Sequence, residues 1–167
     1  MNYTMLAVLV AAVAVTGCGQ KSGEALVEKM IEKQMAKEGV KGKVDLSEGQ
    51  MTIETPQGTA TYAGGAGAKV PDNFPKDVQV YAGAKVLASV NTPQGQNLML
   101  ESGDSVEKII AFYKGKMTGE GWKEEMSMNQ GESSVLVYKK EQRTASIVVA
   151  KAGDGAQINL TVANESR

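Results

Sequence analysis

The sequence predicts an α+β protein in which an antiparallel sheet has a helix packed on one face. Two observations support this prediction. Apolar side chains between residues 106 and 117 recur every three or four positions, which is typical of a half-buried helix. Before and after that stretch, apolar and polar residues alternate in short runs that end in turn-forming residues, as in strands. Strands, then a helix, then a meander favour an antiparallel sheet covered on one side.

The first expected element is a helix near residues 22–38, with Ser22 as its N-cap and Gly39 as its stop. Its apolar residues at helical spacing are Leu26, Val27, Met30, Ile31 and Met35. Its polar residues form a glutamate row and a lysine row, Glu24, Glu28 and Glu32 and then Lys29, Lys33 and Lys37. Balanced charge favours a helix packed on its own domain with a solvated outer face. A helix that binds a lipid surface or a partner is the alternative.

Three short strands are expected next, around residues 44–46, 51–53 and 60–62. The Gly- and Ala-rich run 63–68 predicts a flexible linker, and Pro71 and Pro75 mark a boundary after it. We therefore expect two modules after residues 1–17. Residues 18–69 form a helix, a small β-meander and the linker, and residues 70–167 form an α+β domain. The opposing arrangement pairs the early strands with the C-terminal sheet.

In the C-terminal module, extended segments are expected at residues 78–81, 85–91 and 97–101. A helix then begins at Asp104 or a neighbouring Ser and ends at Gly119 and Gly121. Its buried stripe is Val106, Ile109, Ile110, Tyr113 and Met117. Four strands follow, at residues 122–128, 134–139, 144–151 and 157–163. Trp122 is expected where the helix meets the sheet.

Composition excludes several classes of function. The 167 residues hold 18 Lys and Arg against 19 Asp and Glu, and this balance argues against a nucleic-acid partner. The chain has no His, which excludes a Ser-His-Asp triad and any His-ligated metal. It has one Cys, so no internal disulfide can form. Ser105 and Lys108 match the Ser-x-x-Lys spacing of penicillin-binding enzymes, but the other motifs of those enzymes are absent.

The first 17 residues have the pattern of a signal peptide. The uncharged apolar run at residues 5–16 is too short to span a membrane but suits the core of a secretory signal. Small residues then precede the single cysteine in Val15-Thr16-Gly17-Cys18. This segment resembles the lipobox of bacterial lipoproteins. The resemblance implies cleavage after Gly17 and attachment of a diacylglycerol, and in many species an N-acyl chain, to Cys18. A buried structural Cys after an ordinary signal peptide is the alternative.

The resemblance also bears on localisation. In Gram-negative lipoproteins of this kind, an Asp after the cysteine favours retention in the inner membrane, and this chain has Gly19 there. An exported protein held by lipid on the periplasmic face of the outer membrane is therefore implied for a Gram-negative host. A second resemblance, to small bacterial lipoprotein domains, rests on the runs from Phe74 to Ala84 and from Ser105 to Trp122. This resemblance implies no catalytic residues.

Met126 and Met128 are the candidate metal ligands. Two thioethers on one strand face suit Cu(I), although Met at alternating positions is also typical of a core-facing strand. We therefore expect a non-enzymatic, membrane-anchored envelope lipoprotein without a cofactor, which binds or scaffolds an envelope partner. The alternative is a periplasmic lipoprotein that binds a small ligand or copper, using a groove between helix and sheet.

Overall fold

The computed structural model describes residues 20–165 and confirms the α+β class with a helix packed on one face of an antiparallel sheet. Its helices are α1 (Gln20–Lys37), the short 3₁₀ turn η1 (Gly65–Gly67) and α2 (Val106–Gly119). The strands of the first half are β1 (Lys41–Asp45), β2 (Gln50–Thr55), β3 (Gly58–Gly64), β4 (Lys85–Thr92) and β5 (Gly95–Ser102). Those of the second half are β6 (Lys123–Gln130), β7 (Ser133–Lys140), β8 (Arg143–Ala152) and β9 (Gly155–Asn164).

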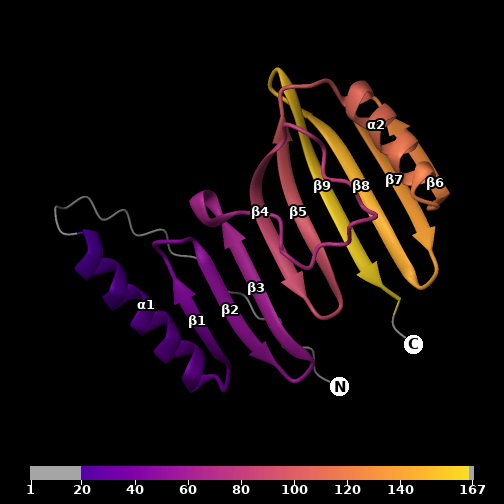
Figure 1. Ribbon diagram of the computed structural model, residues 1–167. Helices are drawn as coiled ribbons and strands as arrows, with labels where there is room; N and C mark the ends of the chain where they lie inside the picture. Colours follow the sequence, from indigo (N-terminus) through magenta and orange to yellow (C-terminus); the bar gives the residue numbers. More distant parts are fainter. Residues whose placement is uncertain (1–19, 166–167) are drawn as a thin grey trace.

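The nine strands form one sheet in the order β1-β2-β3-β4-β5-β9-β8-β7-β6 (Figure 1). Strands β1 to β5 follow one another as a meander, and β6 to β9 form a second meander that runs back toward the first. The two meanders are joined by β5 and β9, with Leu98 opposite Leu160 in the register. Strands β1 and β6 are therefore the two edges of the sheet.

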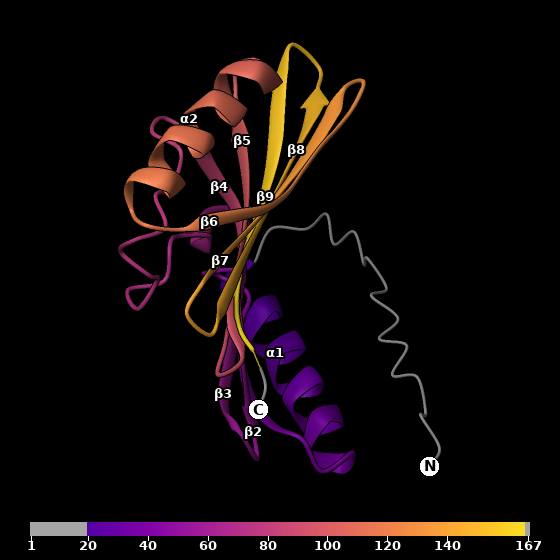
Figure 2. The ribbon, with the colours of Figure 1, turned by 90° about the vertical axis from the view of Figure 1, so that its right-hand side faces the viewer.

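The hydrophobic core lies on one face of the sheet only. Helix α2 packs on this face over β6, β7 and β8. The segment between η1 and β4 crosses the same face and adds Phe74, Val78 and Tyr81 to the core. The other fully buried members include Leu98, Leu100, Ile109, Tyr113, Met117, Leu136, Tyr138, Ile147, Val149, Ile158 and Leu160. Figure 2 shows α1 on the opposite side of the sheet from α2.

Both ends of α2 follow from local sequence chemistry. Ser105, and not Asp104, is the N-cap, because its side chain accepts a hydrogen bond from the backbone N–H of Lys108. At the C-terminal end, Gly121 has φ +80° and donates to the carbonyl of Thr118, while the N–H of Trp122 donates to the carbonyl of Met117. These bonds form a Schellman motif, which turns the chain so that Trp122 packs back under the helix.

Two expectations about local structure are wrong. Residues 78–81 alternate like a strand but form irregular structure, because the neighbouring strands of the sheet already pair with each other. Helix α1 begins at Gln20, so Ser22 lies within its first turn and is not the cap. The side of α1 that faces the sheet also differs from the expectation, as described below.

The early strands join the C-terminal sheet, because β3 pairs with β4 from Thr61 opposite Asn91 to Gly64 opposite Ala88. Strand β3 and η1 occupy most of the run expected to be a flexible linker. The backbone of Gly67 lies so close to the carbonyl of Glu48 that a Cβ would collide with it. Glycine in this run therefore permits close packing of two chain segments.

The independence of residues 70–167 stays a prediction. The main core cluster lies between Phe74 and Val162, so we expect a fragment from Val70 onward to fold alone and to unfold in one cooperative step. Limited proteolysis of the full chain should then yield a stable fragment that begins between residues 63 and 76. Aggregation of the shorter chain through the exposed edge of β4 would show instead that β1 to β3 are required.

Candidate functional site

The space between α2 and the sheet is filled by side chains. From α2, Ile109, Tyr113 and Met117 are completely buried, and the sheet and the segment before β4 cover them from below and from the side. Two shallow depressions of about 400 and 450 Å³ lie elsewhere on the surface. The first is lined by Glu141, Gln142, Arg143, Asn164 and Glu165, and the second by Gly83, Lys85, Glu101, Ser102, Gly103, Ala152, Asp154 and Gly155. Neither lies between α2 and the sheet.

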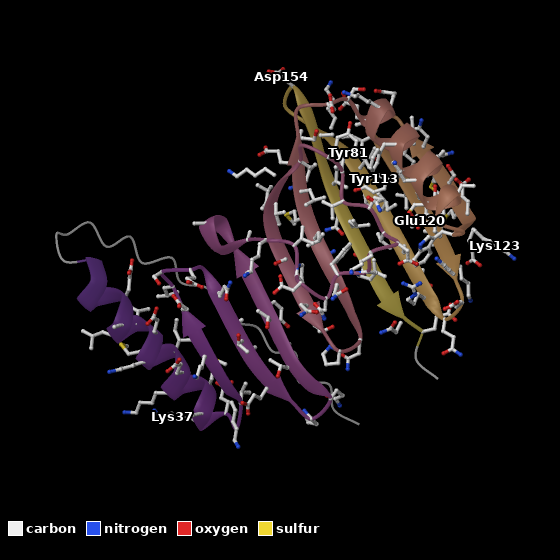
Figure 3. All side chains as sticks on the ribbon, in the orientation of Figure 1. Lys37, Tyr81, Tyr113, Glu120, Lys123 and Asp154 are labelled. Atoms are coloured by element: carbon white, nitrogen blue, oxygen red, sulfur yellow. The ribbon has the colours of Figure 1, made fainter. Side chains whose placement is uncertain are left out.

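One polar group in this interior is poorly satisfied. The hydroxyl of Tyr113 is buried and makes no well-formed hydrogen bond within the described residues. Burial raises the pKa of Tyr113, and the nearby backbone of Tyr81 offsets this rise in part. Figure 3 labels both tyrosines, whose ring centroids lie 6.4 Å apart beneath α2. The hydroxyl of Tyr81, by contrast, donates to Asp104 at 2.7 Å.

A polar cluster fastens the segment before β4 to the second meander. We call Asp77, Trp122, Lys140 and Arg143 the Asp77 clasp. The Arg143 guanidinium donates to both carboxylate oxygens of Asp77 at 3.0 and 2.7 Å, and Lys140 donates to one of them at 2.8 Å. The Trp122 indole N–H donates to the Asp77 carbonyl at 3.0 Å. The guanidinium carbon of Arg143 lies over the Trp122 ring, 5.0 Å from its centroid. The cations and the indole all bind Asp77, so the clasp ties the segment before β4 to the second meander.

The face of the sheet opposite α2 differs from the core face. We call it the open face, and by register its residues form two cross-strand rows. The first row is Met128, Val135, Val148, Asn159, Met99 and Ala88, and the second is Met126, Val137, Ser146, Thr161, Asn97, Val90 and Tyr62. None of these thirteen residues is fully buried, whereas the alternate positions of β5, β7, β8 and β9 mostly are. Within residues 20–165, no helix packs over β5 to β9 on this side (Figure 2).

The middle of the open face is polar and ordered. The Asn97 side-chain amide donates to Asn159 Oδ1 at 2.9 Å and to Thr161 Oγ1 at 2.7 Å. Apolar side chains flank this network on both sides, with Tyr62 and Val90 toward β1 and the two methionines of β6 at the other edge. The open face therefore offers both accessible apolar side chains and fixed hydrogen-bonding groups, the two kinds of contact that protein interfaces use.

Met126 and Met128 point to the open face at the β6 edge, and both are more than 40% exposed. The core-facing interpretation of this pair is therefore wrong, because β6 is an edge strand and no other part of residues 20–165 covers the two side chains. The metal prediction itself stays a prediction. Gln130 donates to the sulfur of Met128 at 2.9 Å, and Met99, the next Met in the same row, lies four strand spacings away, about 19 Å. No cluster of His, Cys, Asp or Glu suited to a metal occurs among residues 20–165.

The other predicted site residues have simple placements. Ser105 caps α2, and the Lys108 ammonium pairs with Asp104 at 2.7 Å, so both residues of the Ser-x-x-Lys spacing serve the start of the helix. Gly17 and Cys18 lie outside the described residues. No helix within the described range combines the length and hydropathy needed to cross a membrane. The Asp77 clasp and the Asn97 network were not predicted from the sequence, because their members are far apart in the chain.

The fold and these surfaces define a small α+β protein with one helix packed on an antiparallel sheet. A family model described as START domain-like matches residues 82–158, a range that includes α2 and the strands beneath it. Because the match covers less than half of the chain, it shows a similarity to that family and not membership of it. Neither the search of curated proteins nor the search of solved structures gives a match.

Proposed function

We propose that this protein is a lipid-anchored, non-enzymatic envelope protein that binds a partner protein on the open face of its sheet. One observation carries the proposal: among residues 20–165 no helix covers this face over β5 to β9, while the interior beneath α2 is already filled. A binding protein requires an accessible surface, and the open face combines accessible apolar side chains with fixed polar groups.

The distribution of exposed apolar residues supports this choice. Within the described residues, the large hydrophobic side chains that remain exposed are Leu26, Val27, Met30, Leu46, Tyr62, Met126 and Met128. Leu26, Val27 and Met30 belong to α1. Tyr62, Met126 and Met128 lie in strands, and all three belong to the open face. None belongs to α2. Exposed apolar side chains on the same face of the sheet are candidates for contact with a partner, although these three strand residues lie at two separate places on it.

Site-specific photo-crosslinking in living cells tests the open face. A photoreactive residue replaces Met126 or Met128, whose side chains lie on the open face. The control position is Ser127, which lies between them in β6 and points to the opposite face of the sheet. We expect a discrete adduct of the same mass from both methionine positions and none from Ser127. Equal adducts from all three positions would show that the strand edge, and not the open face, makes the contact.

Anchoring is tested separately through Cys18. We expect Cys18→Ser to move the exported protein from the membrane fraction to the soluble fraction, because two or three acyl chains give stable membrane binding. Fractionation with immunoblotting measures the shift, and a serine substitution at an exposed site far from α1, Ala82→Ser, is the control. A mutant that still sediments with membranes would show that another part of the chain or a partner holds it there.

Small-ligand binding beneath α2 is a second candidate, favoured by the poorly satisfied Tyr113 hydroxyl and by the START domain-like similarity. Tyr113→Phe separates the two candidates. If the interior only packs, removing an unsatisfied buried hydroxyl should raise the free energy of unfolding by about 1 kcal/mol. If a ligand occupies this region, native mass spectrometry of the wild-type protein should show a bound small molecule that the variant loses.

A further inference from the structure

Helix α1 turns its acidic side toward the sheet. The Glu28 carboxylate accepts a hydrogen bond from the backbone N–H of Leu46 at 2.7 Å, and Glu32 accepts one from Val44 at 3.1 Å. Val44 belongs to β1, the edge strand of the sheet, and Leu46 lies in the turn directly after it. Glu32 therefore satisfies an edge group that would otherwise remain open to another strand, and Glu28 satisfies the turn that follows. Ile31 and Met35 accompany them and are partly buried.

The outer side of α1 has the opposite character. Leu26, Met30, Lys33 and Lys37 follow one another at spacings of four, three and four residues, so they form a single stripe along the helix. Leu26 is 65% exposed and Met30 is 71% exposed. Lys29 extends the basic side of the stripe, and all three lysines are exposed. Figure 3 shows Lys37 at the C-terminal end of α1.

The sequence expectation for α1 is therefore corrected in one respect. The helix packs on its own domain and leaves an exposed outer side, as expected, but the apolar residues Leu26 and Met30 lie on that outer side and not against the sheet. Glu28 and Glu32 bind the edge of the sheet, and the lysines remain outside with the exposed apolar residues. The outer side is thus apolar and basic, which is the pattern of a helix that lies in the plane of a membrane surface.

We propose that the outer stripe of α1, formed by Leu26, Met30, Lys33 and Lys37, lies on the surface of an anionic lipid bilayer. This inference rests on the proposed acylation of Cys18. Gln20, the first residue of α1, follows Cys18 by two positions, so an acylated Cys18 holds the first turn of the helix within a few ångströms of the lipid. The tether makes contact between α1 and the bilayer an intramolecular event with a high effective concentration.

The chemistry of the stripe favours lipid over protein as its occupant. Lysine ammonium groups are attracted to anionic headgroups, and their aliphatic stems extend along the interface while Leu26 and Met30 enter the acyl boundary. A protein interface requires about 800 Å² from each partner. A single row with two large apolar side chains presents much less than that, whereas an interfacial helix requires no broader surface.

Labelling of single cysteines tests the inference in the acylated full-length chain. Acylation consumes Cys18, the only native Cys, so an introduced Cys takes an environment-sensitive dye alone. Leu26→Cys and Met30→Cys place the dye on the stripe. Ala25→Cys places it one residue away on another side of the same helix, at almost the same chain distance from the anchor. In vesicles that contain phosphatidylglycerol, we expect blue-shifted emission at positions 26 and 30 and water-like emission at position 25.

Charge variants complete the test. The double substitution Lys33→Glu and Lys37→Glu should abolish the blue shift at position 30 on anionic vesicles, and Lys33→Arg with Lys37→Arg should preserve it. In the non-acylated Cys18→Ser chain, the double Glu variant should weaken partitioning onto anionic vesicles roughly tenfold, with no change on neutral vesicles.

The possible failures are distinguishable. A wild-type chain that carries no acyl group and does not bind membranes would overturn the proposed anchor. An acylated chain that binds vesicles but keeps positions 26 and 30 as water-exposed as position 25 would overturn the stripe alone. A blue shift that depends on protein concentration without vesicles would show that a second copy of the chain occupies the stripe.

Discussion

Replacing Trp122 with Ala should lower the free energy of unfolding by about 3–5 kcal/mol, the largest effect we expect from a single substitution. The ring is 2% exposed and lies at the end of α2, where Gly121 turns the chain back under the helix. Its removal leaves a cavity in the core and also deprives the Asp77 carbonyl of the indole hydrogen bond. It further removes the surface over which Arg143 stacks.

Thermal unfolding followed by far-UV circular dichroism measures this effect, because the chain has only one Trp and the variant has no indole fluorescence. Trp122→Phe is the matched control, since it retains an aromatic ring and loses the indole N–H. We expect the Phe variant to lie between the wild-type protein and the Ala variant. An unchanged melting temperature for Trp122→Ala would contradict the buried placement of the ring.

Replacing Asp77 with Asn should have the second largest effect, about 2–3 kcal/mol near neutral pH. Hydrogen bonds from the Arg143 guanidinium, supported by Lys140, hold the pKa of the Asp77 carboxyl well below its ordinary value of 3.8. The side chain is 21% exposed, so solvent screens the pair only in part. In the variant, two cations lose the full charge of their shared partner.

The same pair sets the response of stability to acid. Because the pKa of Asp77 is lower in the folded state than in the unfolded state, its contribution to stability is complete above about pH 4. The contribution is lost as the pH falls from there through the lower folded pKa. Denaturant unfolding at a series of pH values should therefore show a shallower acid limb for Asp77→Asn. Asp154→Asn, in the exposed turn between β8 and β9, is the control and should retain the wild-type slope.

Periodicity in the sequence predicted which residues share a face but not which face would be covered. The stripe of α2 was identified correctly in Ile109, Tyr113 and Met117, because one helix packs on a sheet with its apolar side inward. Met126 and Met128 alternate just as regularly, yet they are exposed. Whether a strand face is buried depends on what lies above it, and that is a property of the whole topology.

The same limit applies to α1. Helical spacing correctly placed the glutamates and the lysines in separate rows. It could not show that Glu28 and Glu32 would turn inward, because their partners are backbone groups of the edge strand β1 and of the turn after it. The Asp77 clasp was not accessible from sequence for a related reason. Asp77 and Arg143 are 66 positions apart, and nothing local to either residue indicates the other.

The position of β9 has a consequence for the order in which this fold can form. Strand β9 follows the other eight strands in the chain, yet it lies in the middle of the sheet, between β5 and β8. During synthesis, the meander from β1 to β5 emerges first and ends in an unpaired edge at β5. The sheet becomes continuous only when residues 156–163 arrive to pair with residues 95–102. This late, long-range pairing is expected to limit the folding rate, because distant segments must meet before their contacts stabilise them. A chain cut short before β9 would therefore retain two separate half-sheets, each with an open edge prone to aggregation.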